Sequence, residues 1–177
     1  QETRNKNDDI CHSHCGNFIV ASSKCDKKGN FGCEIWLAKN LSFSDHIVDK
    51  VNIENVRTIF AESRMLAVFV HVHSCKFITV SAHAPWIGND SSKIDVVKSW
   101  WNKFFIHVAN LLQYKVPLCI LIDANLIISK NNVDLPFECG LDEISETFNV
   151  NYNIHPFDIF QLESPYNKGS EVCTLYK

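Results

Sequence analysis

Hydrophobic and other side chains alternate along much of the first half of the chain, a period of two that is typical of β-strands. The alternation is clearest over residues 65–73, MLAVFVHVH. One face there would carry Leu66, Val68, Val70 and Val72, and the other Ala67, Phe69, His71 and His73. Strand-like stretches at 56–62 and 76–83 flank this segment across short connections. The three together predict an antiparallel meander.

Two earlier segments also read as strands. They are residues 17–24 and 33–39, joined across CDKKGNFG, which contains glycine and asparagine, the residues of tight turns.

The period changes to that of a helix over residues 91–114. Apolar side chains recur there at helical spacing: Ile94, Val97, Trp101, Phe104, Phe105, Val108, Leu111 and Leu112. Ser92 followed by Asp95 has the pattern of a capping box, which predicts the helix start. After Pro117, the apolar residues 118–123 predict a buried strand.

The remaining predicted elements are a short helix at 141–150 and strands at 158–163 and 172–176. Several strands, a long amphipathic helix, a buried strand and further strands are typical of sheets packed together with helices outside. We therefore expect an α+β fold, and the length of 177 residues predicts a single domain over 1–177.

Composition narrows the function little. Hydrophobic residues make up 46% of the chain and charged residues 21%, an ordinary globular balance, and the net charge of −3 predicts no global attraction to nucleic acid. No apolar run approaches the ~18 residues of a membrane-spanning helix. The eight cysteines are scattered rather than spaced as a disulfide framework, which favours mostly reduced thiols in an intracellular protein.

Polar residues with useful chemistry stand at two strand ends. Asp123 and Asn125 follow the apolar strand PLCILI, and His83 ends the strand before Ala84-Pro85. A carboxylate there is costly unless it binds a metal, a proton or a partner. The structural alternatives are an Asx-turn for the Asp-x-Asn segment and a surface or hydrogen-bonded role for His83. With a helical crossover between them, the two groups could meet at one edge of the fold.

The order of these motifs resembles the endonuclease/exonuclease/phosphatase (DNase I-like) family. The segments on which the resemblance rests are QETR at the start, GCEIWLAK, HAPW, SWW, LIDAN and VCTLYK. Their combination is most similar to the endonuclease domain of non-LTR retrotransposons. The resemblance implies a four-layer αββα sandwich. It also implies Glu2 as a metal ligand, Asp123 orienting or activating water, Asn125 holding the phosphate or Asp123, and His83 contacting the phosphate.

The family also has an earlier strand ending in asparagine and a terminal Asp–His pair, and neither falls within these residues. The resemblance thus implies a domain truncated at both ends, a sandwich incomplete at the N- and C-termini. Two functions stay open. One is a phosphodiesterase or DNA endonuclease using Mg²⁺ (or Mn²⁺), with DNA as partner and the nucleus as location. The other is an inactive copy without cofactor. It would serve as a structural or interaction subunit of a larger assembly, in an organelle or a large complex, with protein partners covering exposed sheet edges.

Each of the other candidate sites also has a purely structural interpretation. CHSHC could supply zinc through Cys11, His12, His14 and Cys15, but its spacing is not that of a structural knuckle. His71 and His73 could ligate a metal or simply face solvent. The aromatic residues of the helix could stack on bases or form core. Three lysines in the predicted turn could contact phosphates or could simply be solvated: Lys24, Lys27 and Lys28.

Overall fold

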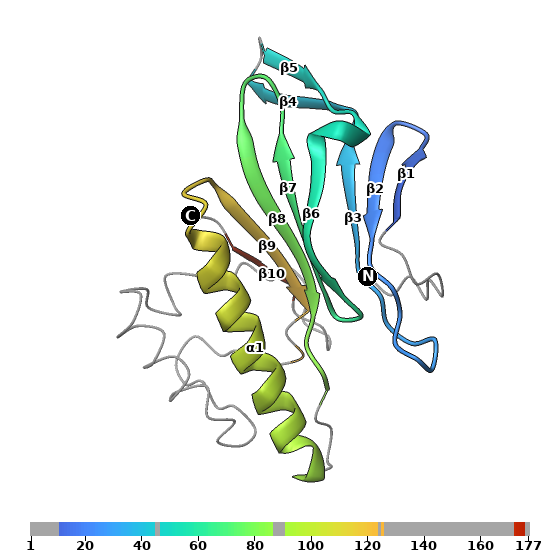
Figure 1. The fold of residues 1–177 in the computed structure, drawn as a ribbon, viewed down its shortest axis with the longest axis vertical. Helices are drawn as coiled ribbons and strands as arrows, with labels where there is room; N and C mark the ends of the chain where they lie inside the picture. The colour runs from blue at the N-terminus through green and yellow to red at the C-terminus, as the bar shows by residue number, and fades with distance from the viewer. Residues whose placement is uncertain (1–10, 45–46, 87–90, 124, 126–171, 176–177) are drawn as a thin grey trace. The chain divides into compact units, whose positions relative to one another are not determined.

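The structure is a computed structural model that describes residues 11–44, 47–86, 91–123, 125 and 172–175. In this part the chain is mixed and sheet-rich, with one long helix, as expected of an α+β class (Figure 1). The chain falls into two compact units. Unit 1 is 1–82 with 116–120, and unit 2 is 83–115 with 121–177. The expectation of a single domain stays a prediction.

Strands β1 (Cys11–Cys15), β2 (Phe18–Ser22) and β3 (Glu34–Ala38) form a three-stranded antiparallel sheet in that order. The β2–β3 hairpin confirms the two strands predicted from the sequence. The first strand, CHSHC, was not predicted, because its residues are mainly polar and have low strand propensity as a group. The Gly16-Asn17 turn joins it to β2, and Gly16 supplies the positive φ of +53° that such turns favour.

The predicted meander is confirmed. Strands β6 (Val56–Glu62), β7 (Met65–His71) and β8 (Lys76–His83) pair antiparallel with their neighbours. A register shift between Thr58 and Phe60 marks a β-bulge in β6. Strand β7 ends at His71, so His73 lies in the turn and not on the strand face that the alternation predicted.

Strand β9 (Leu118–Asp123), also predicted, lies between β8 and β10 (Val172–Leu175) in a five-stranded sheet of order β10-β9-β8-β7-β6. The N–H of Ile78 donates to the Pro117 carbonyl at 2.9 Å, and the N–H of Ala84 to the Asp123 carbonyl at 2.8 Å. Numbering rises together along both strands, so β8 and β9 are parallel, as their arrows show in Figure 1. Their carboxyl ends therefore meet at the same edge.

A hairpin of β4 (Asn40–Ser44) and β5 (Ile47–Lys50), followed by the 3₁₀ turn η1 (Ile53–Asn55), was not predicted. Its two strands are short and carry polar residues, so they lack a clear alternation. The backbone N–H of Ser74 donates to Asp49 Oδ2 at 2.9 Å, and the Ser74 hydroxyl donates to the same oxygen. These two bonds tie the hairpin to the β7–β8 turn.

A hydrophobic cluster of described residues lies in unit 1. It joins one face of the three-stranded sheet to the predicted inward face of β7, so the two sheets pack face to face. The β7 contribution comes from the alternating positions Leu66, Val68 and Val70, and Val72, just after the strand, continues the same alternation into the cluster. The β2 and β3 contributions are Ile19, Ala21, Ile35 and Leu37.

The long helix α1 (Ile94–Leu112) confirms the helical period, and seven of its side chains are buried: Val97, Trp101, Phe104, Phe105, Val108, Ala109 and Leu111. The predicted capping box is wrong. The N-cap is Lys93, with φ −89° and ψ −5° and no side-chain cap. The 3₁₀ turn η2 (Ser91–Lys93) runs directly into the helix, so the backbone is already helical where Ser92 was expected to cap it.

The strand predicted at 172–176 is confirmed as β10, whereas the predicted helix at 141–150 and strand at 158–163 lie outside the described residues. Among the helices of the described part, none is both long and apolar enough to cross a membrane.

Candidate functional site

The carboxyl ends of β8 and β9 bring the predicted site residues of unit 2 together. His83 is the last residue of β8 and Asp123 the last residue of β9. The hydrogen bond from the Ala84 N–H to the Asp123 carbonyl keeps the strands paired one residue further. Pro85 has no N–H and cannot extend the pairing. Two residues distant in sequence thus become neighbours at one sheet edge.

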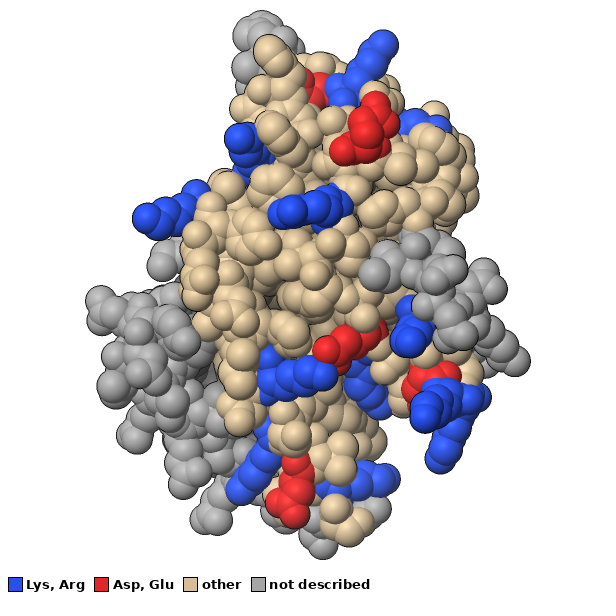
Figure 2. Space-filling view, in the orientation of Figure 1, with Lys and Arg blue, Asp and Glu red and all other residues tan. Residues whose placement is uncertain are grey.

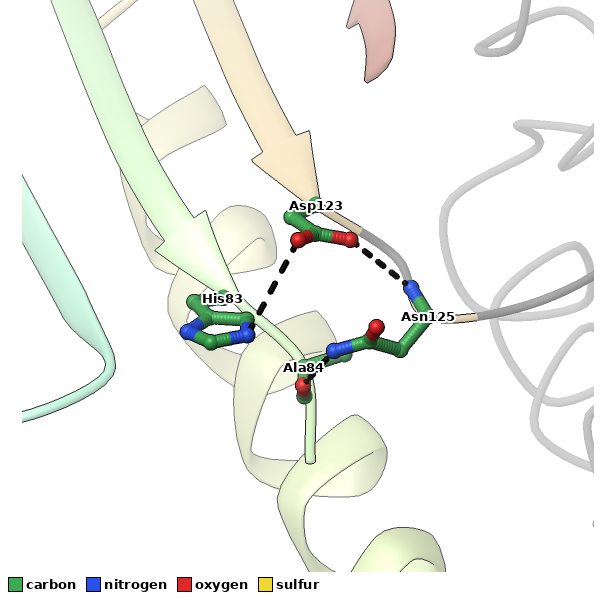
Figure 3. Close-up of polar contacts among 4 residues, drawn as sticks. All are labelled: His83, Ala84, Asp123 and Asn125. Atoms are coloured by element: carbon green, nitrogen blue, oxygen red, sulfur yellow. Dashed lines mark hydrogen bonds and ion pairs between the residues drawn. The ribbon is translucent and has the colours of Figure 1, made fainter. Parts of the chain in front are cut away.

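The imidazole of His83 and the carboxylate of Asp123 face each other across this edge (Figure 3). His83 Nε2 lies 3.8 Å from Asp123 Oδ2. This separation is longer than a hydrogen bond but within ion-pair reach when the imidazole is protonated. The side chains are 16% and 22% exposed, so each is partly open to solvent.

Asn125 makes two separate contacts at this edge, one with the Asp123 carboxylate and one with the backbone after β8 (Figure 3). Its backbone N–H donates to Asp123 Oδ1 at 3.2 Å, which is the bond of an Asx-turn. Its side-chain Nδ2 donates to the Ala84 carbonyl at 2.6 Å. The Asx-turn alternative is therefore correct for the local backbone, and it occupies Oδ1 while Oδ2 faces His83.

The backbone at Asn125 is left-handed, with a φ of +49°. Asparagine tolerates this region better than most residues because its short side chain can bond locally. The Asp-x-Asn spacing thus serves the turn geometry as well as any chemistry. The role of the Ala84 carbonyl as an acceptor was not predicted from the sequence, because a backbone group leaves no side-chain signal.

The arrangement suits proton handling and oxygen-based metal binding. A carboxylate oxygen beside an imidazole can orient that ring, accept a proton or orient a water molecule. The same oxygen is the ligand type that Mg²⁺ prefers. Within the described ranges, no three His, Cys, Asp or Glu side chains converge on one point suited to a metal. Glu2, the metal ligand that the resemblance implies, lies outside those ranges.

The CHSHC segment places its described donors on both faces of a strand. It is strand β1, in which successive side chains point to opposite faces, so His14 and Cys15 point apart. His12 Nε2 lies 2.8 Å from the Thr58 hydroxyl, and partial burial lowers the pKa of His12. These positions disfavour a tetrahedral zinc site made by this segment alone.

The structure also shows where the remaining candidate residues lie. Trp101, Phe104 and Phe105 are buried in α1, which supports core over base stacking. His71 and His73 are exposed and belong to no metal-binding group in the part of the chain described. The three lysines at 24, 27 and 28 line a hollow in unit 1.

Comparisons with models of known protein families and with curated proteins found no match for this chain. The class is therefore defined by geometry: a sheet-rich α+β protein with a His–Asp pair at the carboxyl ends of two parallel strands.

Proposed function

We propose that the chain is a DNase I-like phosphodiesterase domain that cleaves DNA with the help of Mg²⁺ or Mn²⁺, built on a four-layer αββα sandwich. One observation carries the proposal. The imidazole of His83 and the carboxylate of Asp123 lie 3.8 Å apart at one strand edge, and both are partly exposed. Two such groups can exchange protons and contact phosphate oxygens, which is how side chains assist the cleavage of a phosphodiester.

The role proposed for each residue is the one that the resemblance implies, and its contacts are compatible with that role. Asp123 Oδ2 would orient the attacking water and receive its proton, because Oδ1 is already engaged in the turn. His83 would donate a proton or hydrogen bond to a phosphate oxygen. Asn125 is a positioning residue, since both of its hydrogen bonds hold the backbone and the carboxylate of this edge.

The partly exposed carboxylate of Asp123 fits a divalent metal through the water that it would orient, not as a direct ligand. Mg²⁺ is commonly held by one or two carboxylates together with water and substrate phosphates. Glu2 would supply such a carboxylate under the resemblance. The metal, when bound, would stabilise negative charge on the phosphodiester.

The test is cleavage of supercoiled plasmid DNA with Mg²⁺. Asp123→Ala and Asp123→Asn should lower the nicking rate by about 10²-fold or more, a loss typical of general-base groups. Asp95→Ala is the matched control, because Asp95 is an exposed carboxylate on α1. Nicking that is equal in all preparations would identify a contaminant and refute the proposal.

A second function is a structural or interaction subunit, and an exposed aromatic pair favours it. Phe18 and Trp36 lie on the face of β2 and β3 opposite the core, with ring centroids 5.7 Å apart. They are 40% and 51% exposed. Large exposed aromatic side chains are enriched at protein interfaces.

This alternative predicts that a stable protein partner co-purifies with the wild-type chain. The double variant Phe18→Ser/Trp36→Ser should no longer retain that partner. Val48→Ser is the control, because Val48 is a hydrophobic residue of unit 1 outside this pair and is 61% exposed. Equal recovery of the partner with both variants, or a monomer without any partner, would count against a subunit role.

A further inference from the structure

A hollow of about 680 Å³ opens in unit 1 between the β2–β3 loop and the β6–β7 turn. Its walls are residues 24–29 on one side and 61–63 on the other. The volume falls within the range of small-ligand sites, roughly 300–1,000 Å³. The nicking reaction proposed above makes no use of these residues.

The two walls are fastened to each other. The Gly32 N–H donates to the Ser63 carbonyl at 2.7 Å, and the Arg64 guanidinium lies 3.5 Å from the centre of the Phe31 ring. A cation over an aromatic face is attractive, so this contact adds to the hydrogen bond. The hollow thus has fixed walls, which lowers the ordering cost of binding.

The loop wall is also rigid within itself. Asp26 Oδ1 accepts from the Lys28 N–H at 2.9 Å and from the Asn30 N–H at 2.8 Å. The Gly29 N–H donates to the Asp26 carbonyl at 2.9 Å, and Gly29 has a φ of +80° that glycine adopts without strain. These bonds set where the neighbouring lysine side chains begin.

Charge in the hollow is predominantly positive. The lining contains three lysines and two acidic residues, Asp26 and Glu62. The Asp26 carboxylate is engaged by backbone amides, and the bond from the Asn30 N–H is the main cause that lowers its pKa. Lys24 and Lys27 are exposed and form no ion pair within the described part of the chain. Figure 2 shows basic side chains gathered beside acidic ones over the β2–β3 loop, at the lower right.

We propose that this hollow binds a phosphate group of a nucleotide or of a nucleic-acid strand, with Lys24 and Lys27 contacting the phosphate oxygens. Ammonium groups are strong donors to phosphate, and charge-assisted bonds are about twice as strong as neutral ones. The two exposed lysines supply the charge, and the braced walls supply the shape.

The test is a titration of the chain with pyrophosphate, followed through backbone amide NMR signals. Wild type should show saturable shifts at residues 24–29 and 61–63. Lys24→Glu/Lys27→Glu should weaken binding by about tenfold or more, from the loss of two charge-assisted contacts. The control is Lys50→Glu/Lys76→Glu, which makes the same charge change at two other exposed lysines of unit 1.

The control variant should bind pyrophosphate within about twofold of wild type, a small change expected for remote, screened charges. Equal losses in the two variants would show a general charge effect and overturn the site. Shifts that do not saturate, or that fall elsewhere on the chain, would overturn it as well.

A second measurement separates the two sources of phosphate. A short single-stranded oligonucleotide and a nucleoside diphosphate are compared for affinity to wild type and to the loop variant. A tighter oligonucleotide with a steep salt dependence assigns the site to a nucleic-acid strand. A tighter diphosphate assigns it to a free nucleotide. If the loop variant loses neither ligand, the proposal is wrong, whatever the outcome of the nicking assay.

Discussion

The side-chain amide of Asn125 donates to the backbone carbonyl of Ala84 at 2.6 Å, although 41 positions separate the two residues. The bond crosses from the segment after β9 to the segment after β8. It works beside the Ala84 N–H bond to the Asp123 carbonyl, 2.8 Å long. Together the two bonds hold the strand ends at the distance that sets His83 opposite Asp123.

Asn125→Ala should loosen this edge. It leaves the partly buried Ala84 carbonyl without this donor and places alanine at a φ of +49°, with a cost of about 1–3 kcal/mol for the lost bond. Native-state hydrogen exchange of the Ala84 amide should therefore accelerate. Asn125→Gly loses the same bond but relieves the backbone strain, so it should be milder. Unchanged exchange in Asn125→Ala would contradict the bracing role.

Acid should weaken the contact between Asp49 and Ser74. The Ser74 hydroxyl and then its backbone N–H lower the pKa of Asp49 below its ordinary value of 3.8. A depressed carboxyl pKa means that the contact stabilises the fold fully above about pH 4 and is lost as pH falls through the folded pKa. The stability of wild type should thus decline in acid more steeply than that of Asp49→Asn.

Thermal unfolding at a series of pH values measures this difference. Ser74→Ala should remove the larger of the two causes and give an intermediate slope, because its backbone N–H remains. Asp95→Asn, at an exposed carboxylate on α1, should keep the wild-type slope. Parallel curves for wild type and Asp49→Asn would show that Asp49 contributes nothing to the acid dependence.

Trp101 is a core residue of α1 rather than a stacking platform. It is 1% exposed and contacts the ring of Phe104, with centroids 5.6 Å apart. Trp101→Ala should therefore destabilise the fold by about 3–5 kcal/mol in urea denaturation. Ile106→Ala on the exposed side of the same helix should change stability by about 0.5 kcal/mol or less.

Trp101→Phe separates size from polarity at this position. The indole N–H is buried and finds no acceptor among the described residues, so its removal carries no hydrogen-bond loss there. The variant should cost clearly less than alanine. If Trp101→Ala were as stable as wild type, burial of this ring would not support the fold.

Cys33 should resist alkylation in the native protein. Burial is the main cause that raises the pKa of its thiol to about 11, and the side chain is 1% exposed. Since the thiolate is the nucleophile, only about a thousandth of this group would be reactive near pH 8. Cys15 is a free and exposed thiol. Mass spectrometry after brief iodoacetamide treatment should find Cys15 modified and Cys33 intact.

The same treatment in denaturant is the comparison, because unfolding should make the thiols of Cys15 and Cys33 react at similar rates. Cys15→Ser should remove the fast reaction without affecting Cys33. Rapid modification of Cys33 in native protein would show that its segment opens readily.

The regular elements were predictable where the period was long and clean. The alternation from Leu66 to Val72 and the helical recurrence from Val97 to Leu111 each record which side of an element is buried. Strand β1 and the β4–β5 hairpin escaped prediction, because short polar strands leave no such record. The capping pattern at Ser92 misled, because a preceding 3₁₀ turn moved the helix boundary to Lys93.

The candidate site divides in the same way. Local sequence is sufficient to put His83 and Asp123 at strand ends and to form the Asx-turn at Asn125, since these depend on neighbouring residues alone. Their meeting depends on which strands pair and in what direction. That is set by long-range hydrogen bonds and side-chain burial, which no periodicity of two or 3.6 residues encodes. The parallel pairing of β8 with β9 therefore creates the His–Asp pair from two motifs that are separate in the chain.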